Sequence, residues 1–204
     1  MDGVIVFTDR YHYQAWKAMA DSMGIYFDEA INNRLRGVSR MKSLETILER
    51  YGGEPLSDQR KAALAEQKNQ AYVRLLQQMD PSSVSPEVRE TLHHLRCGGY
   101  RLGVGSSSKN TKTILDRTGL TAAFDAISDG TNITHSKPDP EVFLKAAEFL
   151  GLEPDRCAVV EDAEAGIDAA KAANMTAIGI GPASRYRWTD IPIGQFSDLE
   201  GLFL

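Results

Sequence analysis

The sequence predicts an α/β fold, a doubly wound Rossmann-like parallel sheet with an inserted helical bundle. From residue 85 onward, short apolar stretches alternate with helical patterns that end at glycines. Strands and helices that alternate in this way are joined by right-handed crossovers, which make the sheet parallel. Residues 9–80, in contrast, show helical periodicity and no convincing strand. We therefore expect a core domain of residues 1–8 and 81–204, and a helical cap domain of residues 9–80.

Three helices are expected within the helical segment. Trp16 and Met19 lie three residues apart on one face, and Gly24 can end their helix. Ser39 and Ser57 are residue types that cap helix N-termini, so each is expected to begin a further helix.

The core segment is expected to contain four strands. Its predicted elements are, in order, a helix over 86–97, a strand over 101–105, a helix ending at Gly119, a weak strand over 126–128, a helix through Phe143 and Leu150, a strand over 157–160, an alanine-rich helix over 163–173 and a strand over 176–180. In such sheets, ligands bind at the carboxyl ends of the strands.

Composition excludes several classes of protein. Hydrophobic residues make up 42% and charged residues 25% of the 204 residues, which is typical of a globular chain and not of a disordered one. No apolar run approaches the ~18 residues of a membrane span, and the net charge of −5 argues against a general nucleic-acid binder. Cys97 and Cys157 are too few for a disulfide framework. We expect a cytoplasmic monomer whose partner is a small molecule.

Polar residues follow the strand over 101–105 and lead directly into a helix. Residues 106–110 read Ser-Ser-Ser-Lys-Asn. Hydroxyls and backbone N–H groups at a helix N-terminus can bind an anion such as phosphate. The alternative interpretation is a plain serine cap followed by a solvated lysine.

Two further strand ends carry charged residues. Lys137 stands among turn residues after the weak strand and could neutralise a phosphate, although a loop lysine is often only solvated. Glu161 and Asp162 end an apolar strand, and carboxylates of this kind suit Mg²⁺ beside phosphate. The alternative is an acidic pair favoured by the dipole of the following helix.

The order of these motifs resembles the haloacid dehalogenase superfamily. The matching residues are Asp2-Gly3-Val4, Ser106, Lys137-Pro138 and Glu161-Asp162. The segments 11–17, 36–40, 68–69 and 106–110 narrow the resemblance to the β-phosphoglucomutase family. Membership implies a four-helix cap and interconversion of β-glucose 1-phosphate and glucose 6-phosphate through an aspartyl-phosphate, Mg²⁺ and a bisphosphate.

The resemblance also implies roles for the core residues. Asp2 would be the general acid/base, with its backbone carbonyl on the metal. Ser106 and Lys137 would bind the transferring phosphoryl group. Asp162 would bind Mg²⁺, with Glu161 beside it.

The same resemblance implies a second phosphate site and a hinge. The substrate-binding residues would be Arg40, Ser107, Ser108, Lys109 and Asn110, while His12 and Lys68 would act from the hinge and cap. Between residues 30 and 44 there are four cations and no acid, which suits a phosphate ligand. A solvated helix face is the alternative interpretation of these cations.

The family's nucleophile has no counterpart in the printed sequence. Asp2 matches the second aspartate of the family's Asp-x-Asp motif, so the first would lie one residue before Met1. We expect no mutase turnover without it. The strand that leads into this motif is central in the superfamily's sheet. Either residues 4–7 replace that strand, or the natural protein extends further.

Two other functions remain open at this stage. A sugar-phosphate phosphatase on the same scaffold would share the core motifs, because water would attack the same aspartyl-phosphate. A non-catalytic phosphosugar-binding protein would keep the cation and phosphate sites.

Overall fold

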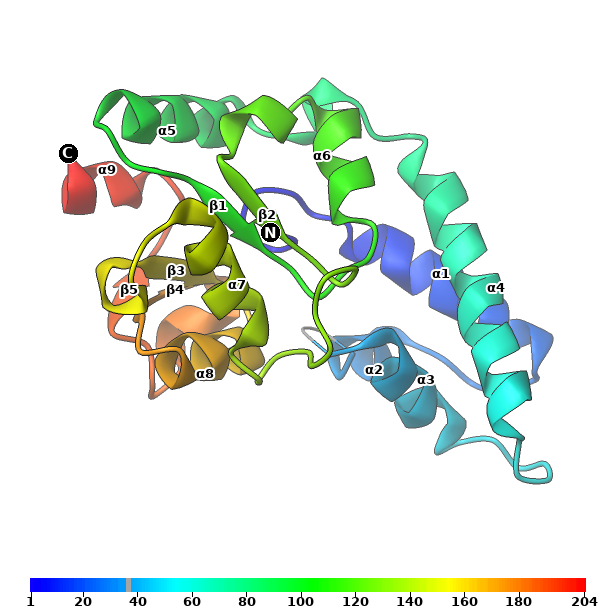
Figure 1. Cartoon of the computed structure of the whole chain (residues 1–204). Coiled ribbons are helices and arrows are strands. Elements are labelled where there is room, and N and C mark those ends of the chain that lie inside the picture. Colours follow the sequence, from blue (N-terminus) through cyan, green and yellow to red (C-terminus); the bar gives the residue numbers. More distant parts are fainter. Residues whose placement is uncertain (36–37) are drawn as a thin grey trace. The chain divides into compact units, whose positions relative to one another are not determined.

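The computed structural model describes residues 1–35 and 38–204, so Arg36 and Gly37 of the 36–40 motif lie outside the described residues. The chain divides into two compact units. The core unit consists of Met1–Phe7 and Met79–Leu204, and the helical unit consists of Thr8–Gln78. The helical unit was expected over residues 9–80, so the observed boundaries lie within two residues of the expected ones. Figure 1 labels the elements of each unit.

The strands of the core unit are parallel, which confirms the predicted α/β fold. They are β1 (Gly103–Gly105), β2 (Ala126–Ser128), β3 (Ala158–Glu161), β4 (Thr176–Ile180) and β5 (Ile191–Ile193). β1 pairs with β2, while β3, β4 and β5 form a second sheet in that order. β5 was not predicted, because a three-residue Ile-Pro-Ile strand is too short to give a pattern.

The core unit also contains helices, two of which pack on these sheets among the contacts described. The helices are α5 (Pro86–Cys97), α6 (Thr111–Thr118), α7 (Glu141–Leu150), α8 (Glu164–Ala172) and α9 (Asp198–Phe203), with 3-10 turns at Pro81–Ser83, Thr121–Ala123, Pro154–Arg156 and Gly181–Arg185. α7 contacts β1 and β2, and α8 contacts β3 and β4 (Figure 1). Ser85 begins α5 by accepting a hydrogen bond from the Val88 N–H at 3.2 Å.

An apolar cavity of about 520 Å³ lies between β1 and β3. Its walls include Val104 and Val159 from the strands, Phe143 from α7, and Met1 and Ile5 from the N-terminal segment. In the described part of the chain, no strand pairing joins β1 to β3. Residues 4–7 do not supply that pairing, because Val4 and Ile5 lie in a turn and Val6 forms an isolated bridge with Asp2. The expected single sheet is therefore split at this cavity.

The described residues of the helical unit form four helices, as the family resemblance implies. They are α1 (Asp9–Ser22), α2 (Glu29–Asn33), α3 (Arg40–Leu48) and α4 (Asp58–Leu76). Ser39 and Ser57 cap α3 and α4 as predicted. The sequence prediction missed α2, whose five residues are capped by the Asp28 carboxylate. Among all described residues, no helix has both the length and the apolar character to cross a membrane.

Candidate functional site

The loop after β1 is shaped by its own hydroxyl groups. Ser106, which is 8% exposed, accepts a hydrogen bond from the Ser108 N–H at 3.2 Å. The Ser108 hydroxyl accepts one from the Asn110 N–H at 3.2 Å. The Ser106 N–H donates to the Ser128 carbonyl at 3.0 Å, which joins the loop to the end of β2. The predicted phosphate loop is thus a folded turn, with two of its N–H groups bonded to its own side chains and Lys109 exposed.

Lys137 connects the carboxyl ends of β1 and β3. Its ammonium donates to the Gly105 carbonyl at 3.2 Å and forms an ion pair with Glu161. The ammonium also lies 4.6 Å from the centre of the Phe143 ring. Lys137 is 9% exposed, so it is not the solvated loop lysine of the alternative interpretation. Burial in a polar pair fixes the ammonium at the end of β1, against the residue that precedes Ser106.

Glu161 and Asp162 are neighbours with opposite pKa shifts. Burial opposes ionisation of Glu161, but the charges of Lys137 and the Met1 ammonium outweigh it and lower its pKa. Burial, followed by repulsion from Glu161, raises the pKa of Asp162 to about 6. The second Glu161 oxygen accepts hydrogen bonds from the N–H groups of Asp162 and Ala163 at 3.2 and 3.4 Å. Asp162 is therefore the carboxylate of the pair that would gain most from a nearby cation.

The N-terminal motif lies against Asp162. Gly3 has φ +74°, and a Cβ atom built on it would lie 2.0 Å from an Asp162 carboxylate oxygen. Only glycine allows this approach. The Met1 amino group is also at this point: burial lowers its pKa, while Glu161, Asp162 and Asp2 act in the opposite direction. All four motifs of the sequence analysis thus meet in the core unit.

The donor set at this point fits Mg²⁺. Asp162 and Asp2 offer oxygen atoms, which Mg²⁺ prefers, and their clustered negative charge favours a divalent cation. One carboxylate oxygen of Glu161 already pairs with Lys137, and the other accepts hydrogen bonds from backbone N–H groups. These contacts orient Lys137, and they make Glu161 less suited than Asp162 to bind the metal directly.

In the helical unit, Lys68 contacts His12, and Arg40 contacts two residues of α4. The Lys68 ammonium lies 2.7 Å from His12 Nδ1. Arg40 donates to the Asn69 side-chain oxygen at 2.9 Å and lies 3.6 Å from Glu66. Burial, followed by repulsion from Lys68 and Arg40, lowers the pKa of His12 well below its usual value. Burial also lowers the pKa of Arg40.

Asp129 is a buried residue that the sequence analysis missed. In the described residues, two buried side-chain atoms have no hydrogen-bond partner, Ser107 Oγ and Asp129 Oδ2. Asp129 follows β2, and its other oxygen accepts hydrogen bonds from the Thr131 N–H and hydroxyl at 2.8 and 2.6 Å. A Cβ atom on Gly130 would lie 2.5 Å from the Ser107 carbonyl oxygen, so this turn packs directly on the phosphate loop. The weak β2 pattern gave no signal for it.

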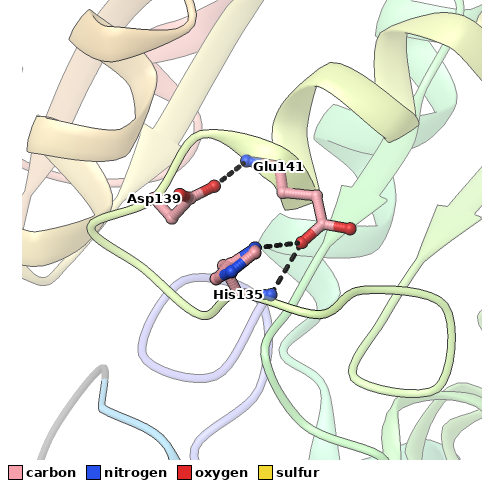
Figure 2. Close-up of side chains that lie close together, drawn as sticks. All are labelled: His135, Asp139 and Glu141. Atoms are coloured by element: carbon pink, nitrogen blue, oxygen red, sulfur yellow. Dashed lines mark hydrogen bonds and ion pairs between the residues drawn. The ribbon is translucent and has the colours of Figure 1, made fainter.

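A second group of potential metal ligands lies at the start of α7. Figure 2 shows His135, Asp139 and Glu141, whose ligand atoms lie within 4.8 Å of one another. Glu141 already accepts hydrogen bonds from the Thr134 and His135 N–H groups at 2.8 and 2.7 Å, and Lys145 lies 2.8 Å away. These contacts give the group a structural role: they attach the loop that carries Lys137 to the start of α7.

The chain belongs to the haloacid dehalogenase-like hydrolase family, whose model matches residues 1–174. It is 40% identical to a β-phosphoglucomutase of Bacillus subtilis, over 98% of this chain and 88% of that protein. The crystal structure of a β-phosphoglucomutase from Clostridium difficile matches with a TM-score of 0.89 and 35% identity, covering 97% of this chain and 89% of that one.

Phosphatases are also among the relatives. The chain is 33% identical to the fructose-1-phosphate phosphatase YqaB of Escherichia coli, over 88% of this chain and 93% of that protein. The chain is therefore an enzyme by family, and its relatives include both a mutase and a sugar-phosphate phosphatase.

Proposed function

We propose that this chain carries the site of a β-phosphoglucomutase-type phosphotransferase, an enzyme that interconverts β-glucose 1-phosphate and glucose 6-phosphate through an aspartyl-phosphate and a bisphosphate, but that the 204 residues alone lack the phosphoryl acceptor. The observation that supports it most is the meeting of Ser106, Lys137, Asp162 and the Asp2-Gly3 turn in the core unit. One buried ammonium, a hydroxyl loop and clustered carboxylates are the groups that phosphoryl transfer needs.

In this proposal, each core residue has a distinct task. Ser106 and Lys137 hold the transferring phosphoryl group, with Lys137 held in place by Glu161 and the Gly105 carbonyl. Asp2 moves a proton to or from the sugar hydroxyl. Asp2 and Asp162 would hold Mg²⁺, which neutralises charge on the phosphoryl oxygens.

A phosphotransferase of this type needs an aspartate two positions before Asp2 as its phosphoryl acceptor, and the 204 residues do not contain it. The Met1 nitrogen lies among Glu161, Lys137, Asp162 and Asp2, so a residue joined to it would begin within the cluster. Asp2 cannot serve as both acid/base and nucleophile in one step. The 204-residue chain is therefore expected to bind phosphosugars without turning them over.

The alternative is a sugar-phosphate phosphatase, as in the Escherichia coli relative. A mutase must retain a bisphosphate, so it needs a binding site for a second phosphate. Arg40 and Lys68 of the helical unit are proposed to supply it, and residues 108–110 are proposed separately as phosphate-binding residues of the core unit. A guanidinium can bind phosphate through two parallel charge-assisted hydrogen bonds, and this favours Arg40 as the principal ligand.

Arg40→Ala tests this assignment. It should weaken binding of glucose 6-phosphate about tenfold or more, because a charge-assisted pair is lost, yet spare inorganic phosphate binding at Ser106 and Lys137. Isothermal titration of both ligands measures the two effects.

Arg34→Ala is the matched control. Arg34 belongs to the same unit but is exposed and pairs with Glu49, so its replacement should leave both affinities unchanged. If Arg40→Ala lowered the affinity for glucose 6-phosphate and for inorganic phosphate equally, Arg40 would not be a ligand of a second phosphate.

A further inference from the structure

An aromatic clamp, Trp16 of α1 and Tyr72 of α4, encloses the Lys68 ammonium. The Lys68 nitrogen lies 4.7 Å from the centre of each ring. Lys68 is 4% exposed, and the two aromatic residues are 2% and 1% exposed. An ammonium ion buried among apolar groups is costly unless something attracts it, and the faces of aromatic rings do so. The clamp therefore fixes where this charge can stand.

Tyr72 also holds His12. The two rings are stacked, with centroids 4.0 Å apart and planes inclined by 21°. The Tyr72 hydroxyl donates to the Thr8 hydroxyl at 3.0 Å, which restrains the ring from its far end. One side chain thus contacts both members of the His12–Lys68 pair.

The chemistry of this pair defines the histidine tautomer. An ammonium only donates hydrogen bonds, so His12 Nδ1 must accept the 2.7 Å contact and the ring proton must be on Nε2. Lys68 of α4 and Arg40 of α3 are the cations that act on His12, and both disfavour a charged imidazole, while Tyr72 of α4 stacks on the ring. A neutral ring with a fixed donor and a fixed ammonium is suited to an oxygen-rich ligand.

We propose that Tyr72 is a positioning residue that keeps His12 as the neutral Nε2–H tautomer in contact with Lys68, so that both present donors to the oxygens of a phosphosugar. The ligand class rests on the proposed function, while the positioning role stands on the contacts alone. Stacking requires an aromatic ring and not a hydroxyl, so phenylalanine should serve and an aliphatic residue should not.

The test uses ¹⁵N NMR of the histidine rings in the full chain between pH 5 and 8. The chain has four histidines, and His12→Gln identifies the His12 signal. The native chain and Tyr72→Phe should show a neutral Nε2–H ring throughout. Tyr72→Leu should show a mixture of tautomers or a midpoint nearer the ordinary ~6.5. Tyr72→Met provides the same comparison if the leucine variant does not fold.

Leu76→Ala separates positioning from general packing. Leu76 is fully buried on the same helix one turn later, so this variant should lose stability and keep the native His12 signal. An unchanged His12 signal in Tyr72→Leu would overturn the proposal. So would the same change in Leu76→Ala, or an Nδ1–H ring in the native chain.

Titration with glucose 6-phosphate tests the ligand class separately. Tyr72→Leu should weaken its binding about tenfold, with Tyr72→Phe near the native value. If the native chain does not bind glucose 6-phosphate at all, the proposed function fails, while the NMR result still decides the role of Tyr72.

Discussion

Asp162 is the residue at which burial and charge act most clearly on one carboxyl group. Burial and the neighbouring Glu161 both disfavour its ionised form and raise its pKa to about 6. Its contact with Gly3 leaves no room for a Cβ atom there. A carboxylate in this situation is stabilised by a divalent cation, which supports its proposed role as a ligand of Mg²⁺.

Asp162→Ala should abolish the Mg²⁺ dependence of inorganic phosphate binding. The native chain is expected to bind phosphate more tightly as Mg²⁺ is added, by more than about tenfold at saturation. The measurement is a phosphate titration at several Mg²⁺ concentrations. Asp116→Ala, an exposed aspartate on α6, is the control and should keep the native dependence. An unchanged Mg²⁺ titration in Asp162→Ala would remove this residue from the metal site.

At the residue scale, the sequence predicted which side chains matter and not how they pair. Lys137 and Glu161 were assigned to phosphate and metal, whereas the structure joins them as a buried ion pair. Removing one member of such a pair commonly costs about 3–5 kcal/mol. Pairing across 24 positions depends on how two loops meet, and this information is absent from either motif alone.

At the scale of elements, the start of α7 holds the Lys137 loop. Glu141, the first residue of α7, accepts a hydrogen bond from the His135 N–H (Figure 2). It also accepts one from the Thr134 N–H and pairs with Lys145. The Lys145 hydrogen bond, followed by the His135 N–H, lowers the pKa of Glu141 to about 2. A lowered pKa means that the ionised form stabilises the folded chain above its unfolded value of 4.5, and that this stabilisation disappears as the pH falls toward 2.

Glu141→Gln should therefore destabilise the chain near neutral pH and matter progressively less below about pH 4.5. Urea unfolding of the native and variant chains from pH 7 to about pH 3 measures the difference. Glu148→Gln, on the exposed side of the same helix, should show no such pH-dependent difference. A Glu141→Gln difference that stays constant with pH would show that its charge does not hold the loop.

Helices with clear capping residues could be predicted from the sequence, whereas very short helices and strands could not. Ser39 and Ser57 begin the helices that their positions predicted, and α5 covers the helix expected over 86–97. β5 and α2 are too short for periodicity, and both are held by their neighbours in the fold. The strand predicted over 101–105 is confined to Gly103–Gly105, because Leu102 donates its N–H to the Asp125 side chain.

At the scale of the molecule, the order of the motifs along the chain was the main basis for predicting the family. Four weak motifs in a fixed order indicated the family, which the family model and the Bacillus subtilis relative support. The sheet is divided at the 520 Å³ cavity, where the family resemblance places the central strand that leads into the Asp2 motif, and residues 4–7 do not replace that strand. An apolar strand added before Asp2 and ending in Asp-Leu is expected to fill this cavity.

The most direct test of the account is a coupled assay of glucose 6-phosphate formation from β-glucose 1-phosphate, with a catalytic amount of bisphosphate. It compares the 204-residue chain with one extended by an apolar strand that ends in Asp-Leu before Asp2. The account predicts turnover by the extended protein, and none by the 204-residue chain. Robust turnover by the unextended chain, or release of inorganic phosphate in place of glucose 6-phosphate by the extended one, would contradict it.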